Sequence, residues 1–452
     1  MKTTFLHLSR RPATWLRSVG LGAGLLLGAC HSTSDPSPSL DPSPATSTYR
    51  ADVAVGWLAL QLRLTRLTPV TPANTFARPF GYTGIAGYEA AVPGMANHRS
   101  LAGQLNGLTG LPTADKTLVY SWALSANAAL AASNRNFFAN TSPALLATID
   151  SLEAANRITY SAGISTEAST RSIAFGQQVA TAVLDWARAD GFAVAGAAYT
   201  PPTGPGLWAP TAPANAPAVL PYWGNNRLLV AGSGEGSDPG PPPAYSTVAG
   251  SPFQAMAQEV YDISQTRTPE QTAIALFWND VPNGRSFTPP GHWVSILQQV
   301  LVKENPALDR ALLAYAKLGI SLSDALVTTF KMKYTYNVLR PITYIRGAMG
   351  QPGWLSLIPA PAFPEYSAGH GVVSGAAAET MTELFGATYA FTDQGYVPFG
   401  IAARSFMSFE QAGVEAGISR VYGGIHFRPT IDKSLIQGKK IAQNLDARLK
   451  FE

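Results

Sequence analysis

Apolar residues recur at helical spacing along most of the chain. From Ala51 to about Gly191, segments rich in alanine and leucine alternate with short turns. Three of these segments, residues 118–134, 142–158 and 166–189, are long and periodic enough to predict helices. The pattern resumes at residue 253 and continues to residue 449, without the alternation of strands and helices that indicates a parallel sheet. We therefore expect an all-α fold, a large helical bundle.

One long stretch interrupts this pattern. Residues 201–250 contain 11 prolines and 8 glycines, a density that excludes regular helices. We expect an irregular, Pro/Gly-rich connection over residues 195–250. It would join an N-terminal helical half, residues 51–194, to a C-terminal helical domain, residues 251–452, that carries the candidate chemistry.

The first thirty residues have the features of a secretory signal. Basic residues come first, an apolar run over 19–27 follows, and the sequence Leu-Gly-Ala-Cys ends at Cys30, the single cysteine of the chain. This ending resembles a bacterial lipobox, which implies a signal peptide over residues 1–29 and a lipid on Cys30. The alternative is an ordinary signal peptide with a chance cysteine. Residues 30–50 are rich in serine and proline and predict a tether. We expect a cell-envelope protein that is lipid-anchored to a bacterial membrane, facing the periplasm or the surface.

Composition and charge narrow the function further. The chain of 452 residues is 46% hydrophobic and 13% charged, which is enough apolar material for a large core. Its formal net charge of +4 comes entirely from four basic residues within 1–29, a segment without acids. The remainder carries 28 basic and 28 acidic residues. A neutral chain lacks the general attraction for phosphate backbones, so nucleic acid is not an expected partner.

Three segments of the C-terminal half place charge where the pattern expects apolar side chains. In the first, Leu322 and Phe330 mark a helical stripe on which Lys333 and Arg340 follow, just before Pro341. Buried cations without partners are costly, so this stripe implies an anion. Snorkelling side chains or an internal salt bridge are the alternative. Few acids occur near these segments, and the nearest are Glu365, Glu410 and Glu415.

The second segment, residues 361–370, combines prolines with Ser367 and with Gly369 directly before His370. A run of small residues follows, so we expect a helix start whose exposed N–H groups form a seat for an anion. A histidine at this place is otherwise a capping or packing residue.

The third segment is residues 418–426. Arg420 shares a helical stripe with apolar residues, so it also faces inward. The pair Gly423-Gly424 should end the helix and turn His426 back toward the same region.

Together the three segments resemble one known superfamily. Their order and spacing are Lys333-x6-Arg340-Pro341, Ser367-Ala-Gly-His370 and Ser419-Arg420-x5-His426. This combination resembles vanadium-dependent haloperoxidases and type 2 phosphatidic acid phosphatases. The segments 277–280 (Phe-Trp-Asn-Asp) and 288–293 (Thr-Pro-Pro-Gly-His-Trp) look like those of the bacterial haloperoxidase branch.

The resemblance implies a bound vanadate, or a phosphate in the same site. The residues that would hold the oxyanion are Lys333, Arg340, Ser367, Gly369, Arg420 and His426. Of these, His426 would be the metal ligand, or the nucleophile in a phosphatase, and Lys333 would also polarise the bound group during catalysis. His370 would be the catalytic acid–base. We expect Asp280 to support catalysis by orienting His370 or a ligating side chain; a surface carboxylate is the alternative.

Two positions depart from the family pattern. Ala368 stands where the family has a serine, and Ser367 stands where a proline is expected, so that one hydroxyl donor is lost or Ser367 replaces it. Thr430 stands where the phosphatase pattern has an aspartate, which weakens the case for a His–Asp pair at His426.

Three functions remain open. The leading hypothesis is a vanadium-dependent haloperoxidase that oxidises halide with hydrogen peroxide. The second is a soluble acid phosphatase that hydrolyses a phosphomonoester through a phosphohistidine. The third is a surface-anchored binding lipoprotein with a decayed site, for which Ala368 is the main support. The long N-terminal half and the segment 288–293 favour the haloperoxidase.

Overall fold

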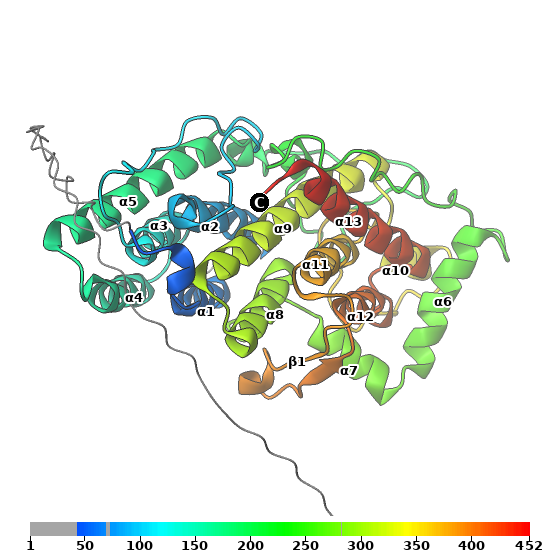
Figure 1. The fold of residues 1–452 in the computed structure, drawn as a ribbon. Helices are drawn as coiled ribbons and strands as arrows, with labels where there is room; N and C mark the ends of the chain where they lie inside the picture. Colours follow the sequence, from blue (N-terminus) through cyan, green and yellow to red (C-terminus); the bar gives the residue numbers. More distant parts are fainter. Residues whose placement is uncertain (1–42, 69–72, 282) are drawn as a thin grey trace, which may run out of the picture. The chain divides into compact units, whose positions relative to one another are not determined.

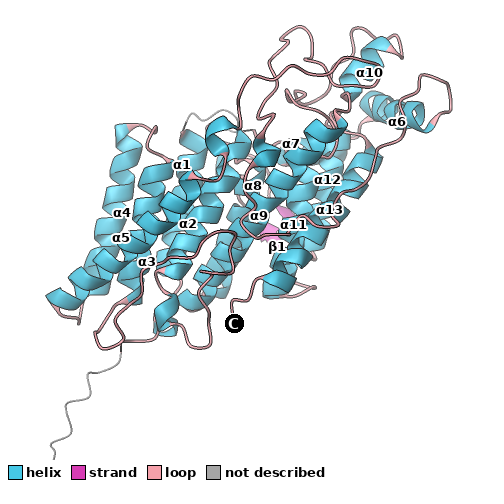
Figure 2. Cartoon of the chain, turned by 90° about the horizontal axis from the view of Figure 1, so that it is seen from above, coloured by secondary structure: helices cyan, strands magenta, loops and turns pink. Residues whose placement is uncertain are grey.

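The computed structural model describes residues 43–68, 73–281 and 283–452. These residues belong to one compact unit. The predicted signal peptide over 1–29, Cys30 and most of the tether over 30–50 lie outside the described residues. Thirteen α-helices and one pair of short strands make up the regular structure of the described part (Figures 1 and 2). The predicted all-α fold class is confirmed.

The described part of the N-terminal half holds five α-helices, three of which begin at a capping serine. They are α1 (Asp52–Leu67), α2 (Ala77–Glu89), α3 (Trp122–Phe137), α4 (Pro143–Ser161) and α5 (Thr166–Arg188). Ser121, Ser142 and Ser165 each cap a helix, since each side chain accepts a hydrogen bond from a backbone N–H three residues later. The three helices expected here are therefore present, and the first begins four residues later than predicted.

The C-terminal part holds the remaining elements. Its helices are α6 (Pro252–Thr266), α7 (Pro269–Phe277), α8 (Pro289–Glu304), α9 (Leu308–Tyr336), α10 (Pro341–Gly347), α11 (Gly369–Phe385), α12 (Phe409–Tyr422) and α13 (Arg428–Arg448). Two strands, β1 (Phe391–Asp393) and β2 (Arg404–Phe406), form an antiparallel pair in which Phe391 lies opposite Phe406. The sequence did not predict this hairpin.

Helix α9 joins the two halves into one core. Most of its side chains are buried, and its backbone touches that of α2. A Cβ atom at Gly84 would lie 2.9 Å from Ala316 Cα, and one at Gly319 would lie 2.5 Å from the carbonyl oxygen of Phe80. Only glycine permits this approach. Helix α9 is long and apolar enough to cross a membrane. However, 94% of its most apolar 18-residue stretch is buried inside the protein, as in the core helix of a globular domain.

The connection over 195–250 is irregular, as predicted, with one short 3₁₀ turn at Trp223–Asn225. It is nevertheless held against α9. The buried carboxylate of Asp324 accepts hydrogen bonds from Leu229 N (2.7 Å), Val230 N (3.1 Å) and Ser233 Oγ (2.8 Å). Three donors on one buried carboxylate fix this part of the connection to the helix that also carries Lys333.

Candidate functional site

Two buried cations lie where α9 ends and α10 begins. Lys333, in the last turn of α9, donates from Nζ to the carbonyl oxygens of Pro364 (2.8 Å) and Glu365 (3.1 Å). Arg340 precedes α10 as its N-cap residue and donates from Nε to the carbonyl oxygen of Phe363 (2.9 Å). Both cations lie over the Phe363 ring, at 4.7 and 5.0 Å from its centre. Burial lowers the pKa of both groups, that of Arg340 to about 9.

Arg340 is buried, as expected, but the prediction that it lies on the same helical stripe as Lys333 was wrong. Helix α9 ends at Tyr336, and Asn337 takes a left-handed conformation with a φ of 48°. Arg340 therefore does not continue the stripe of α9. It reaches the interior because the chain turns at Asn337 and runs extended into Pro341, the first residue of α10.

His426 faces these cations. Helix α12 ends at Tyr422, and Gly424 turns the chain with a φ of 80°, as the Gly-Gly pair predicted. The Nε2 atom of His426 lies 3.2 Å from Nη1 of Arg340, and its Nδ1 atom lies 2.8 Å from Oε1 of Glu365. Because a guanidinium only donates, Nε2 is the acceptor and Nδ1 carries the proton. Burial and then the positive charge of Arg340 hold the pKa of His426 well below its usual value. The imidazole is neutral, with the lone pair of Nε2 turned toward the cations.

Glu365 supplies the carboxylate that holds His426. It is fully buried and also accepts hydrogen bonds from Phe427 N (3.1 Å) and from Oγ1 of Thr430 (2.9 Å). Burial raises its pKa to about 7. The sequence identified Glu365 only as a nearby acid. Thr430, which stands where an aspartate was expected, holds this carboxylate, so His426 has an acidic partner from another segment.

Arg420 brings a third buried cation from the last turn of α12. Its Nη1 donates to the carbonyl oxygen of Trp278 (2.7 Å), and burial lowers its pKa to about 10. The charges of Lys333, Arg340 and Arg420 all act on His426. Helix α11 packs against both α9, which carries Lys333, and α12, which carries Arg420 (Figure 1).

None of the three cations has a carboxylate within 4.0 Å among the described residues. Of the nearby acids, Glu415 pairs with Arg404, Glu410 lies near Lys439 and Glu365 holds His426. Several buried donors also lack an acceptor: Arg340 Nη2, Arg420 Nε and Ser367 Oγ. The donor set therefore fits an oxyanion, because tetrahedral oxyanions accept many hydrogen bonds from cationic groups.

The start of α11 adds backbone donors to this set. Gly369 is the first residue of the helix, and no side chain caps the helix start. A Cβ atom built on Gly369 would meet nothing within 4 Å, so there is open space beside it. Ala368, buried beside it, donates its N–H to Oγ of Ser434 (2.9 Å) and brings no hydroxyl to the site. The buried hydroxyl of Ser367, which has no partner, is the one available at this turn.

His370, the second residue of α11, is held by Asp280. The Nε2 atom of His370 lies 3.2 Å from Oδ2 of Asp280, the contact that was expected of this acid. Burial and then the charge of Arg420 lower the pKa of His370 to about 4. His370 is therefore neutral near pH 7, donates from Nε2 to Asp280 and keeps the lone pair on Nδ1.

Asp280 is itself fixed by a buried network. Its Oδ1 atom accepts from the Tyr396 hydroxyl (2.6 Å) and lies 2.9 Å from Nδ1 of His292, whose Nε2 lies 2.7 Å from Oδ2 of Asp393. Burial opposes a charge on His292, but the two carboxylates prevail and raise its pKa to about 10. The result is a chain His370–Asp280–His292–Asp393 with a buried imidazolium between two carboxylates. The roles of His292 and Asp393 could not be predicted from the sequence, because residues 101 positions apart in the chain share no local pattern.

Comparisons with known proteins agree with this arrangement. The family model of the VCPO second helical-bundle domain matches residues 313–450. Vanadium chloroperoxidase of Curvularia inaequalis is 27% identical over 214 residues, which are 42% of this chain and 35% of that protein. The match thus spans about a third of the length of that relative.

Solved structures extend the likeness to most of the chain. The crystal structure described as the first bacterial vanadium-dependent iodoperoxidase is 33% identical, with a TM-score of 0.80, and the comparison covers 89% of this chain and 97% of that one. A holo-type bacterial vanadium-dependent chloroperoxidase shares the fold, with a TM-score of 0.60 at 14% identity, over 84% of this chain and 94% of that one.

Proposed function

The chain belongs to the vanadium-dependent haloperoxidase superfamily, and from this premise we propose that it is an enzyme that binds vanadate and oxidises halide with hydrogen peroxide. The observation that carries the proposal is the set of three buried cations that have no carboxylate partner among the described residues and that face a neutral histidine whose Nε2 lone pair points toward them. The net reaction takes up hydrogen peroxide, a halide ion and one proton and releases hypohalous acid and water.

The residues that would hold the vanadate oxygens are Lys333, Arg340, Ser367, Gly369 and Arg420, and His426 Nε2 would be the metal ligand. When bound, vanadate would supply a Lewis-acidic centre that activates the peroxide. Arginine side chains match the oxygens of an oxyanion with paired donors, and Lys333 adds a point charge. Because these charges are fixed in a buried site, they do not need to reorganise as charge develops during the reaction.

His370 would move the protons of this reaction. Its Nε2 is held by Asp280 at 3.2 Å, and its neutral state near pH 7 leaves Nδ1 able to accept a proton from hydrogen peroxide. A protonated His370 would then return the proton to the leaving oxygen. Asp280 would act by positioning His370 and by stabilising its charged form.

The test is a pair of assays on the purified full-length chain after incubation with vanadate. We expect hydrogen peroxide to oxidise iodide or bromide only when vanadate is present. We expect little phosphomonoester hydrolysis when vanadate is absent. His426→Ala should abolish the halide oxidation, whereas Glu379→Gln, at a partly buried acid on α11 that pairs with Lys439, should not change it. Oxidation that is independent of vanadate, or unaffected by His426→Ala, would contradict the proposal.

The contact between His426 and Glu365 supports a second candidate, an acid phosphatase. A carboxylate on Nδ1 is the arrangement that activates a histidine as a nucleophile, and it lies at 2.8 Å. Phosphate would then take the vanadate site, His426 would form a phosphohistidine, and His370 would protonate the leaving group. Hydrolysis without vanadate, and its inhibition when vanadate is added, would favour this candidate over halide oxidation.

We also propose that the enzyme is lipid-anchored at a bacterial cell envelope through Cys30, facing the periplasm or the surface. The support is the sequence of residues 1–30, which lie outside the described residues. Cys30→Ser should release the protein from the membrane fraction. An unmodified Cys30 in the mature protein, measured by mass spectrometry, would contradict this proposal.

A further inference from the structure

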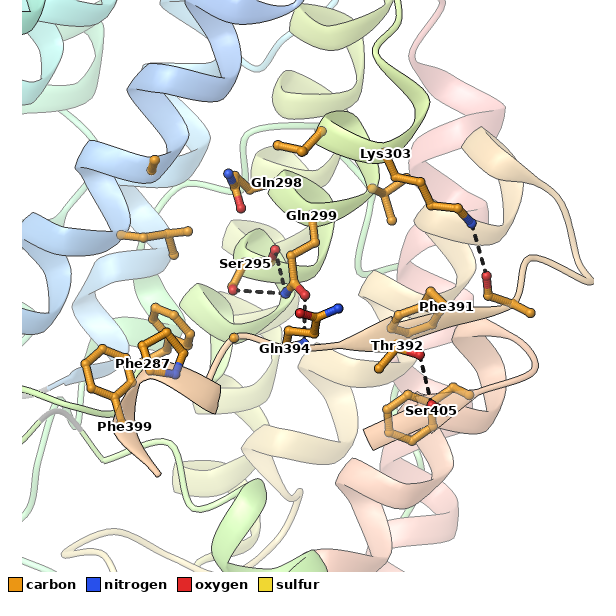
Figure 3. A pocket seen from close by; sticks show the side chains of 18 of the residues that line it. Phe287, Ser295, Gln298, Gln299, Lys303, Phe391, Thr392, Gln394, Phe399 and Ser405 are labelled. Carbon is orange, nitrogen blue, oxygen red and sulfur yellow. Dashed lines mark hydrogen bonds between the residues drawn. The ribbon is translucent and has the colours of Figure 1, made fainter. Parts of the chain in front are cut away.

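A cavity of about 980 Å³ lies between α1, α8 and the hairpin of β1 and β2 (Figure 3). Its volume is that of a site for a small organic molecule. None of the residues that form the oxyanion site lines it. The cavity is therefore a different site from the one described above.

The charged side chains that line this cavity are all cationic. They are Arg63 and Arg66 of α1 and Lys303 of α8, and no aspartate or glutamate lines the cavity. Arg63 and Arg66 have no carboxylate within 4.0 Å among the described residues, and Lys303 lies 3.9 Å from Glu304. In a chain whose basic and acidic residues balance after residue 29, three cations around one cavity favour an anionic ligand.

The two arginines also repel each other. They lie one helical turn apart on α1, and after burial the charge of Arg63 is the main cause of the lowered pKa of Arg66. Like charges at this spacing destabilise a helix. A bound anion would relieve this repulsion.

Aromatic rings form part of the remaining lining, which also holds aliphatic and polar side chains. The guanidinium of Arg66 lies 4.6 Å from the centre of the Phe399 ring and 5.8 Å from that of Phe287. The rings of Phe287 and Phe399 lie at one end of the cavity, and Lys303 and Phe391 lie at the other (Figure 3). A small inorganic anion would leave these aromatic surfaces uncovered, whereas an apolar ring or chain would bury them.

The amide side chains of Gln298 and Gln299 line the cavity between these two ends. Gln299 is fully engaged, since it donates to Oδ1 of Asp393 (3.0 Å) and accepts from the N–H of Gln394 (2.8 Å). The side chain of Gln298, which lies next to Gln299 in Figure 3, has no hydrogen-bond partner among the described residues, so its amide can bind a ligand.

We propose that this cavity is a binding site for an apolar organic anion, an aromatic carboxylate or sulfonate whose charged group pairs with Arg66 and Arg63. Its apolar body packs on Phe399 and Phe287. The proposal does not depend on the function assigned to the oxyanion site.

The test is calorimetric titration of the full-length chain with naphthalene sulfonate as the probe. We expect saturable one-to-one binding that excess vanadate does not displace, and much weaker binding of the uncharged naphthalene methanol. Arg66→Gln should weaken binding roughly 10- to 100-fold, the loss expected for a charge-assisted contact. Phe399→Ala should also weaken it, and Lys440→Gln, at an exposed cation on α13 outside the cavity, should have no effect.

Thermal unfolding of each variant separates loss of binding from loss of folding. If Arg66→Gln unfolds at room temperature, Arg63→Gln replaces it, because Arg63 is exposed and its loss should leave the fold intact. Arg63→Gln should weaken binding of the probe severalfold. Absent binding, equal binding of the uncharged analogue, displacement by vanadate, or unchanged affinity in every cavity variant would each overturn the proposal.

Discussion

The carboxylate of Glu365 lies 2.8 Å from Nδ1 of His426, and this contact decides which nitrogen of the imidazole faces the three cations. With Nδ1 donating to Glu365, Nε2 keeps its lone pair and accepts from Arg340 at 3.2 Å. Thr430 and the N–H of Phe427 hold the carboxylate in place. One buried acid therefore sets both the tautomer and the direction of His426.

Replacing Glu365 with glutamine should weaken vanadate binding. A glutamine amide can present a donor to Nδ1, which permits the wrong tautomer of His426. We expect the Kd for vanadate to rise about 10- to 100-fold, as for other partners of metal-binding histidines. Calorimetry measures this change. Thr430→Val removes one donor to the Glu365 carboxylate but keeps the carboxylate in place, so it should raise the Kd less. An unchanged Kd in Glu365→Gln would contradict the role of Glu365 in orienting His426.

Ser367 should matter for anion binding and not for stability. Its buried hydroxyl has no hydrogen-bond partner in the described part of the chain, so Ser367→Ala removes a desolvated group without breaking a contact seen there. We expect an unchanged or slightly higher melting temperature, and a loss of vanadate affinity that corresponds to about 1 kcal/mol. If stability falls and affinity is unchanged, the hydroxyl does not serve the anion.

His292 should make stability depend on pH. Its pKa rises from 6.5 to about 10 on folding, so the stabilisation it provides is fully present below pH 6.5 and is lost as pH rises toward 10. We expect the melting temperature of the wild type to fall over this range. His292→Gln should lack this fall and be destabilised at pH 6.5 by about 3 to 5 kcal/mol, since it leaves two carboxylates without their cation.

The matched control for His292 is His98→Gln. His98 lies near a single, exposed carboxylate, that of Glu452 at 3.6 Å, so its loss should leave the pH dependence intact. If the melting temperatures of His292→Gln and of the wild type change with pH in the same way up to pH 10, His292 is not a buried imidazolium.

Asp280 should control the protonation of His370. Its hydrogen bond and charge raise the pKa of His370 against the effects of burial and Arg420. Asp280→Asn should therefore move the acid limb of the pH–rate profile to lower pH and reduce kcat about 10- to 100-fold through loss of positioning. Tyr396→Phe removes one donor to Asp280 and the acceptor of the Phe287 N–H, but leaves the carboxylate beside His370, so it should leave the acid limb in place. An unshifted limb in Asp280→Asn would contradict the role.

The sequence predicted the parts of the site that local patterns encode. Lys333 lies on the buried stripe of a regular helix, and the Gly423-Gly424 pair turns the chain before His426, so both placements followed from periodicity and turn chemistry. The helical fold and the irregular connection over 195–250 followed in the same way.

The parts that depend on long-range packing were beyond these patterns. Arg340 was assigned to a helical stripe, but the turn at Asn337 ends that helix. Glu365 and His292 owe their roles to residues 61 and 101 positions away along the chain, at His426 and Asp393. Such contacts depend on the packing of helices and leave no spacing rule within one segment.

Calorimetric titration of vanadate into the wild-type chain and into His426→Ala tests directly whether His426 is part of an oxyanion site. We expect one-to-one binding to the wild type, competition by phosphate for the same site, and loss of tight binding in His426→Ala while its melting curve stays cooperative. If the wild type binds no vanadate at millimolar concentration, or if His426→Ala binds it as tightly as the wild type, the oxyanion site proposed around His426 is contradicted.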